Sequence, residues 1–177
     1  MIKKSFLRRG IEYILLLLLA IFVASCGVRN KNSQVYSTPK EKEVTLLRKI
    51  TTIYIDKPKK ALQMLDSAEQ HRLIPIEEIQ NLRAMSYFYG LDNPQKALEC
   101  ANKGYSNAIE NVDTLAQLNS LKVLVTVYYM QSHYTEVIIK SNEAIELALK
   151  IKDKESVAFF YMALGSAKSE IDNLNDA

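Results

Sequence analysis

The feature that most constrains the fold is a helical pattern that recurs about every forty residues. Three segments, "IDKPKKALQMLDSAEQ", "LDNPQKALECANKGYS" and "QSHYTEVIIKSNEAIE", begin with turn-forming residues and continue with a small or branched apolar residue. That residue is Ala61, Ala97 or Val137, and Ala177 has the same place in "IDNLNDA", so the spacings are 36, 40 and 40 residues. A period of this length indicates repeated supersecondary units.

A second helix precedes most of these segments and completes the unit. The stretches "EEIQNLRAMSYFYG", "LAQLNSLKVLVTVYYM" and "SVAFFYMALGSAKSE" carry apolar residues at i, i+3, i+4 and i+7, the spacing of one helix face. The sequence therefore predicts an all-α chain of helix pairs. Ala97, Ala101 and Gly104 are expected where two helix backbones approach closely, because a large side chain there would push the helices apart.

Helix starts are predicted from capping residues. Asn93 followed by Pro94 is a capping residue with proline at the first helical position, and Asp56 with Pro58 is a less regular version. Pro75, Asp113 and Asp153 are expected to open the first helices of the later pairs. The last segment, "IDNLNDA", is expected to be a turn. Without a following helix pair, we expect apolar residues of the last helix to lack a partner, namely Phe159, Phe160, Met162 and Leu164.

The N-terminus has the layout of an export signal. Four basic residues precede an apolar run from Ile11 to about Ala24, interrupted by Glu12, which is short for the roughly twenty residues that span a bilayer. The run ends in "VASC", which resembles the lipobox of bacterial lipoproteins. The resemblance implies a signal peptide over 1–25, cleavage after Ser25 and a diacylglycerol on Cys26. The alternative is an uncleaved membrane anchor with Cys26 incidental.

Residues 26–43 are expected to be a flexible linker after the lipidated cysteine, and 44–177 the helical domain. The segment "GVRNKNSQ" after Cys26 contains no acidic residue, and acidic residues there direct surface export in one group of lipoproteins. By that resemblance the protein is expected in the cell envelope, lipid-anchored and facing the periplasm.

The formal charge of +3 belongs to residues 1–25, since the other 152 carry 19 basic and 19 acidic side chains. This neutrality gives no indication of nucleic-acid binding.

The repeating unit resembles the tetratricopeptide repeat, and the chain as a whole resembles a Bacteroidetes-type lipoprotein built from such repeats. Phe88 and Tyr128 occupy the aromatic position of the family pattern, while Ala97, Ala101 and Gly104 match its small positions. The resemblance implies a right-handed α-solenoid of antiparallel helix hairpins. It also implies a groove, lined by the first helices, that binds a peptide or protein. The groove candidates are Leu82, Ser86, Tyr89, Asn119, Lys122, Thr126 and Tyr129. The competing interpretation is that Tyr89 and Tyr129 pack between repeats.

Sequence motifs for chemistry are lacking. The chain has no glycine-rich phosphate loop, no Gly-x-Ser-x-Gly elbow and no paired metal ligands, so we expect neither catalysis nor a metal or cofactor. His133 is expected to be a solvated turn residue, His71 to end a helix, and Cys100 to be a buried thiol.

Two functions therefore compete. One is a membrane-tethered scaffold or adaptor for protein-protein interaction. The other is the exported sensory part of a membrane-spanning regulator, of which this chain would be the N-terminal piece. A nutrient-binding lipoprotein is disfavoured because the chain has no tryptophan and no long loop.

Overall fold

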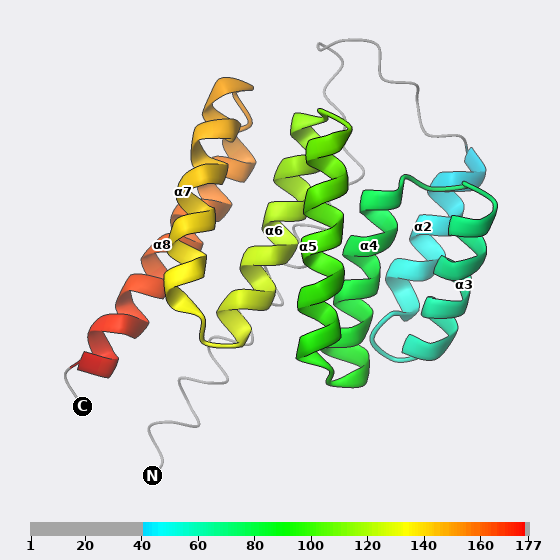
Figure 1. Ribbon diagram of the computed structural model, residues 1–177, viewed down its shortest axis with the longest axis horizontal. Helices are drawn as coiled ribbons and strands as arrows, with labels where there is room; N and C mark the ends of the chain where they lie inside the picture. Colours follow the sequence, from blue (N-terminus) through cyan, green and yellow to red (C-terminus); the bar gives the residue numbers. More distant parts are fainter. Residues whose placement is uncertain (1–40, 176–177) are drawn as a thin grey trace. The chain divides into compact units, whose positions relative to one another are not determined.

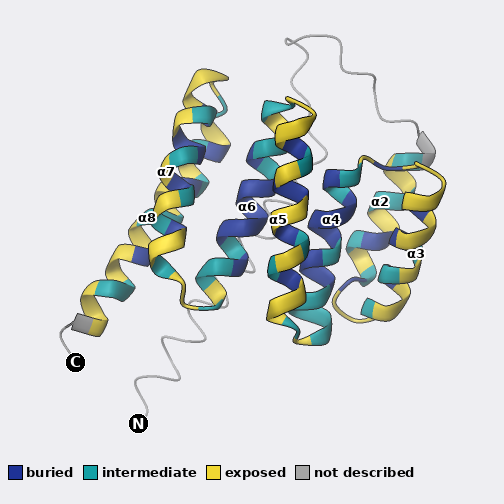
Figure 2. Cartoon of the chain, viewed as in Figure 1, coloured by how far each residue is buried: buried dark blue, intermediate teal, exposed yellow. Residues whose placement is uncertain are grey.

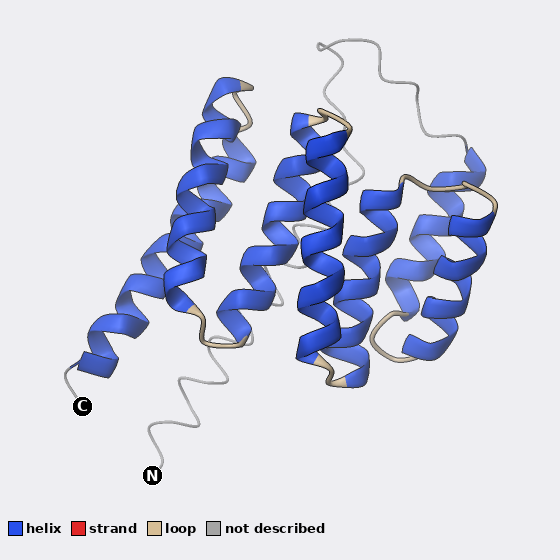
Figure 3. Cartoon of the chain, in the orientation of Figure 1, coloured by secondary structure: helices blue, strands red, loops and turns tan. Residues whose placement is uncertain are grey.

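The computed structural model describes residues 41–175, and these residues are helical with short connections (Figures 1 and 3). They belong to one unit, Lys40–Ala177. The elements in chain order are α2 (Glu41–Ile53), α3 (Pro58–Gln70), α4 (Ile76–Met85), the π-helical η1 (Ser86–Gly90), α5 (Pro94–Glu110), α6 (Thr114–Met130), α7 (Tyr134–Lys150) and α8 (Lys154–Asn175). The all-α class predicted from the sequence is confirmed for this part of the chain. Helix α2 already begins at Glu41, within the range expected to be linker.

Most helix starts follow the predicted caps. The side chain of Asn93 accepts a hydrogen bond from the Lys96 backbone N–H at 3.0 Å, and Pro94 is the first residue of α5. Asp113 accepts from two backbone N–H groups at the start of α6, as a capping carboxylate does. The prediction for Asp56 is wrong, because Lys57 occupies the cap of α3 without a side-chain bond. Pro58 alone fixes the start of that helix, since its ring presets the helical φ.

The connections share a backbone feature that recurs every twenty residues. Five non-glycine residues have positive φ angles between 48° and 61°, and they are Arg72, Asp92, Val112, Ser132 and Lys152. Around Val112, the Asp113 N–H reaches the carbonyl of Ala108 at 3.3 Å and the Val112 N–H reaches that of Ile109 at 2.9 Å. This pair of bonds defines the Schellman motif at a helix end. The same pair of bonds recurs around Arg72, Ser132 and Lys152.

The helices pack mainly against their neighbours in the chain, and alternate helices also meet. Contacts join α2 to α3, α4 to α5, α5 to α6, α6 to α7 and α7 to α8, while α6 also contacts both α4 and α8. Helix α6 is therefore surrounded by four others. Its middle turns are almost entirely buried (Figure 2). A largely apolar helix is the sequence pattern expected for such a position.

Two glycines mark places where one helix lies close to another. A β-carbon built on Gly104 would lie 2.5 Å from Oδ1 of Asn81 and 3.2 Å from the carbonyl oxygen of Glu77. This confirms the predicted close contact of helices at Gly104. A β-carbon on Gly90 would lie 2.5 Å from Cβ of Pro58, so η1 rests directly on the first turn of α3.

The last helix differs from the prediction. Helix α8 continues through Ile171 to Asn175, where a turn was expected, and Ala177 lies outside the described residues. The expected turn lacks the proline that ends the helical path in "LDNP", so no residue there interrupts the backbone hydrogen bonds. The expectation for Phe160 is also wrong, because this side chain is fully buried. Met162 is exposed as expected, whereas Phe159 and Leu164 are half-buried.

Candidate functional site

One stripe of α6 is less buried than the rest of the helix. Between residues 118 and 127, only Asn119 and Thr126 are not buried. They are seven residues apart and therefore lie on the same face of the helix. The stripe comprises Leu115, Asn119, Lys122, Thr126 and Tyr129, at steps of four, three, four and three residues. Four of these five residues are groove candidates predicted from the sequence, and the helix brings them onto one face.

The polar side chains in the middle of this stripe differ in whether they form hydrogen bonds with the rest of the protein. The Thr126 hydroxyl donates to the Lys122 carbonyl at 2.8 Å, one turn earlier. The side chains of Asn119 and Lys122 form no hydrogen bond or ion pair with other described residues. Lys122 is 7% exposed, so most of its length lies against its neighbours. An amide and an ammonium group on one face offer donors to carboxylate or carbonyl oxygens.

Tyr129 ends the stripe within a small aromatic and acidic group. Its ring meets that of Tyr134 edge to face, with 5.5 Å between the centroids. Burial, followed by the nearby charges of Glu170 and Tyr134, raises the pKa of Tyr129 to about 12. The phenol therefore keeps its proton at neutral pH and can donate a hydrogen bond.

The groove candidates of α4 and η1 lie deeper than those of α6. Leu82 is 5% exposed, and Ser86 is fully buried with its hydroxyl donating to the Leu82 carbonyl at 2.8 Å. Tyr89 packs edge to face on Phe88 at 5.1 Å. Its hydroxyl is buried and has no hydrogen-bond partner among the described residues, and burial raises the pKa of this phenol. Tyr89 and Tyr129 occupy equivalent positions forty residues apart. Tyr89 lies in η1 and its hydroxyl is buried, whereas Tyr129 lies at the end of the α6 stripe.

A buried polar seam between α4, α5 and α6 was not predicted. The Asn81 amide donates to the Ser120 hydroxyl at 3.0 Å in a buried bond. The amide of Asn111, which is exposed at the C-cap of α5, donates to the Glu77 carboxylate at 3.2 Å in a partly buried bond. Each of these residues has a polar neighbour in the chain, so no sequence signal marked them. Buried hydrogen bonds of this kind restrict which register the helices can adopt, because any shift would leave the groups unpaired.

Carboxylates gather at the start of α4, beside this seam. Burial raises the pKa of Glu78 to about 7, with smaller contributions from the neighbouring charges of Glu77 and Glu43. Glu78 is half-buried, so part of this residue remains accessible to solvent. Because its pKa is about 7, it gains and loses its proton within the physiological pH range. Within the described range, no group of three or more His, Cys, Asp or Glu side chains is arranged to hold a metal.

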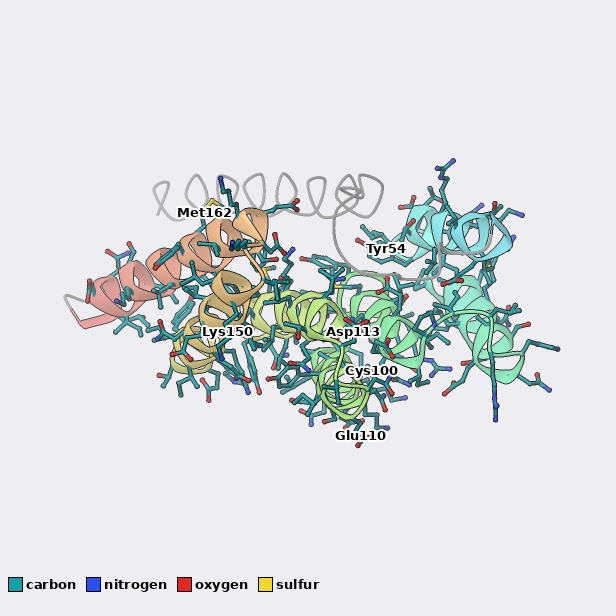
Figure 4. All side chains as sticks on the ribbon, turned by 90° about the horizontal axis from the view of Figure 1, so that it is seen from above. Tyr54, Cys100, Glu110, Asp113, Lys150 and Met162 are labelled. Carbon is teal, nitrogen blue, oxygen red and sulfur yellow. The ribbon has the colours of Figure 1, made fainter. Side chains whose placement is uncertain are left out.

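The two sides of the helical array carry different residues (Figure 4). Met162 of α8 and Tyr54, at the end of α2, lie towards one edge of this view, and Glu110 of α5 lies at the opposite edge.

His133 is exposed, as predicted, and His71 follows the last residue of α3. Cys100 is half-buried instead of buried, and burial raises the pKa of its thiol. Cys26 lies outside the described residues.

No helix between residues 41 and 175 has the length and apolar character needed to cross a membrane. The arrangement offers hydrogen-bond donors and aromatic edges along one helix face. Comparisons with family models, with curated proteins and with solved structures found no match to this chain.

Proposed function

We propose that this chain is a membrane-tethered scaffold of the bacterial cell envelope, with tetratricopeptide-like repeats that bind a peptide or protein along α6. Lipid on Cys26 would hold it at the membrane, facing the periplasm, and the polypeptide would perform no catalysis. The α6 stripe carries the proposal, because it combines partly exposed polar groups with a helix whose middle turns are otherwise buried.

The repeat architecture is supported by four observations. Helices pack in chain order, the small residues Ala97 and Ala101 are fully buried, and Gly104 lies against α4. The left-handed turn residues recur at equal intervals of twenty. Chain-order packing with an equal repeat length is what a solenoid of helix hairpins requires. A solenoid would extend the α6 face into a groove shared with α4 and α8.

Binding by this face is supported by its chemistry. Asn119 and Lys122 present donors that have no described partner, and Tyr129 adds a rigid ring with a protonated hydroxyl. Tyrosine is enriched in protein interfaces because it combines contact area with a polar end. A bound segment with a carboxylate opposite Lys122 would neutralise this otherwise unpaired charge.

Site-specific photocross-linking in the native cell tests this function. A photoreactive amino acid at Asn119 or Thr126 should form an adduct with a defined partner protein. The same group at Ile139 of α7, which is 57% exposed, should not. Lys122→Glu should abolish the adduct while the helical circular dichroism is unchanged. Equal adducts from Ile139, or adducts that are insensitive to Lys122→Glu, would contradict binding by α6.

The intact mass of the protein extracted from membranes tests the anchor separately. A mass that begins at Cys26 with two or three acyl chains supports the tether, and Cys26→Ser should remove the lipid. A much larger mass without lipid would instead favour the sensory part of a longer membrane-spanning regulator.

A further inference from the structure

Helix α8 carries an exposed stripe along most of its length. The stripe consists of Lys154, Ala158, Tyr161, Gly165, Lys168 and Asp172, at steps of four, three, four, three and four residues. Tyr161 is 55% exposed, and a β-carbon built on Gly165 would meet no atom within 4 Å. This spacing matches the a and d positions of a helix that packs against one partner helix. The described part of the chain supplies no helix that covers the stripe.

The equivalent residues of α6 show what this face does elsewhere in the molecule. Positions forty residues before Ala158, Tyr161 and Gly165 are Leu118, Leu121 and Val125. These three are 0%, 0% and 1% exposed, because helices pack on that side of α6. The face is therefore a helix-packing surface in one repeat and an uncovered surface in the next.

The α8 stripe is complementary to itself when read in the opposite direction. In an antiparallel pair centred on Ala163, Tyr161 faces Gly165 of the second copy, and Gly165 faces the second Tyr161. Lys154 faces Asp172 at each end, and Ala158 faces Lys168. Large residues thus meet small ones, and the terminal charges are opposite in sign.

We propose that α8 is a homodimerisation surface, on which two copies of this chain pair antiparallel about Ala163. The resulting interface is isologous, so each half contributes the same contacts. The open space over Gly165 receives the tyrosine ring of the other copy. Exposed ion pairs contribute little to affinity, so Lys154 and Asp172 select the antiparallel register and Tyr161 supplies most of the buried area. This inference stands independently of the partner-binding face on α6.

Disulfide cross-linking of the full chain in its native membrane tests the pairing. Lys154 and Asp172 are separated by eighteen residues, about 27 Å along one helix, so cysteines there cannot join within a copy. In a Cys100→Ala background, the double variant Lys154→Cys with Asp172→Cys should form a covalent dimer under mild oxidation. Each single variant should remain at the background level, because antiparallel pairing keeps identical positions of the two copies apart.

A second variant removes the shape complementarity without disturbing the fold. Gly165→Lys in the double-cysteine chain should reduce the dimer at least tenfold, because the lysine occupies the space that Tyr161 of the other copy requires. The helix should persist, since lysine is a better helix former than glycine and the position is open. The proposal is overturned if the double variant forms no more dimer than the singles. It is also overturned if Gly165→Lys leaves the dimer unchanged while the circular dichroism remains helical.

Discussion

The same substitution, glycine to alanine, should have opposite effects at two helical positions of this chain. In an open helix interior, alanine is favoured over glycine by about 1 kcal/mol, because glycine loses more backbone freedom on folding. Gly165 is such a position, because a methyl group added there would meet no atom within 4 Å. Gly165→Ala should therefore raise the free energy of unfolding by about 1 kcal/mol.

At Gly104 the added methyl group meets two neighbours. It would lie 2.5 Å from Oδ1 of Asn81 and 3.2 Å from the backbone oxygen of Glu77. Asn81 is 4% exposed and its amide is bonded to Ser120, so it cannot move away without breaking that hydrogen bond. Overpacking costs about 1–3 kcal/mol and a broken buried hydrogen bond about 1–3 kcal/mol, against about 1 kcal/mol gained from helix propensity. We expect a net loss of about 1–5 kcal/mol.

Urea unfolding of the helical domain, followed by circular dichroism at the helical band, measures the free energy of unfolding of both variants. The difference between the two variants should be about 2–6 kcal/mol. Each kcal/mol corresponds to roughly 3–5 °C in melting temperature for a domain of this size. Low protein concentration keeps α8 unpaired during the measurement. If Gly104→Ala is as stable as Gly165→Ala, then α4 and α5 do not approach as closely as the structure describes.

Two further predictions concern a turn and a carboxylate. Val112 is β-branched and 81% exposed with φ at 54°, so Val112→Gly should stabilise the fold by about 1 kcal/mol in the same urea assay, and Lys152→Gly by less. The raised pKa of Glu78 means that the folded state holds its proton up to about pH 7, while the unfolded chain releases it nearer 4.5. Stability should therefore fall as pH rises through this window. Glu78→Gln should raise the melting temperature at pH 8 and leave it unchanged at pH 4; an equal effect at both would show that the charge of this carboxylate is not the destabilising factor.

Much of the helical layout could be predicted from the sequence because it depends on local side-chain chemistry. Asn93 with Pro94 and the carboxylate of Asp113 act within one turn of their own backbone, so their roles follow from their neighbours in the chain. The spacing of Ala97, Ala101 and Gly104 likewise reports a close helix contact, because only small residues fit there.

Other features depend on contacts that a one-dimensional pattern does not contain. The left-handed turns at Val112 and Lys152 are held by backbone hydrogen bonds, so no glycine marks them. The π-helical turn that contains Tyr89 arises beside the contact of Gly90 with Pro58, thirty-two residues earlier. For the candidate site, the resemblance to the repeat family grouped Asn119, Thr126 and Tyr129, and α6 places them on one face. The resemblance could not show that Ser86 is enclosed.

The equal spacing of the left-handed turns has a consequence for how this chain can change in length. Each interval of twenty residues reverses the chain direction once, so forty residues restore both the direction and the side of the array. Gaining or losing a forty-residue block would preserve every remaining helix contact type, whereas a twenty-residue block would exchange the two sides beyond it. The molecule can therefore gain or lose one hairpin at a time. Each such change gives the array a different last helix, and therefore a different exposed stripe at its end.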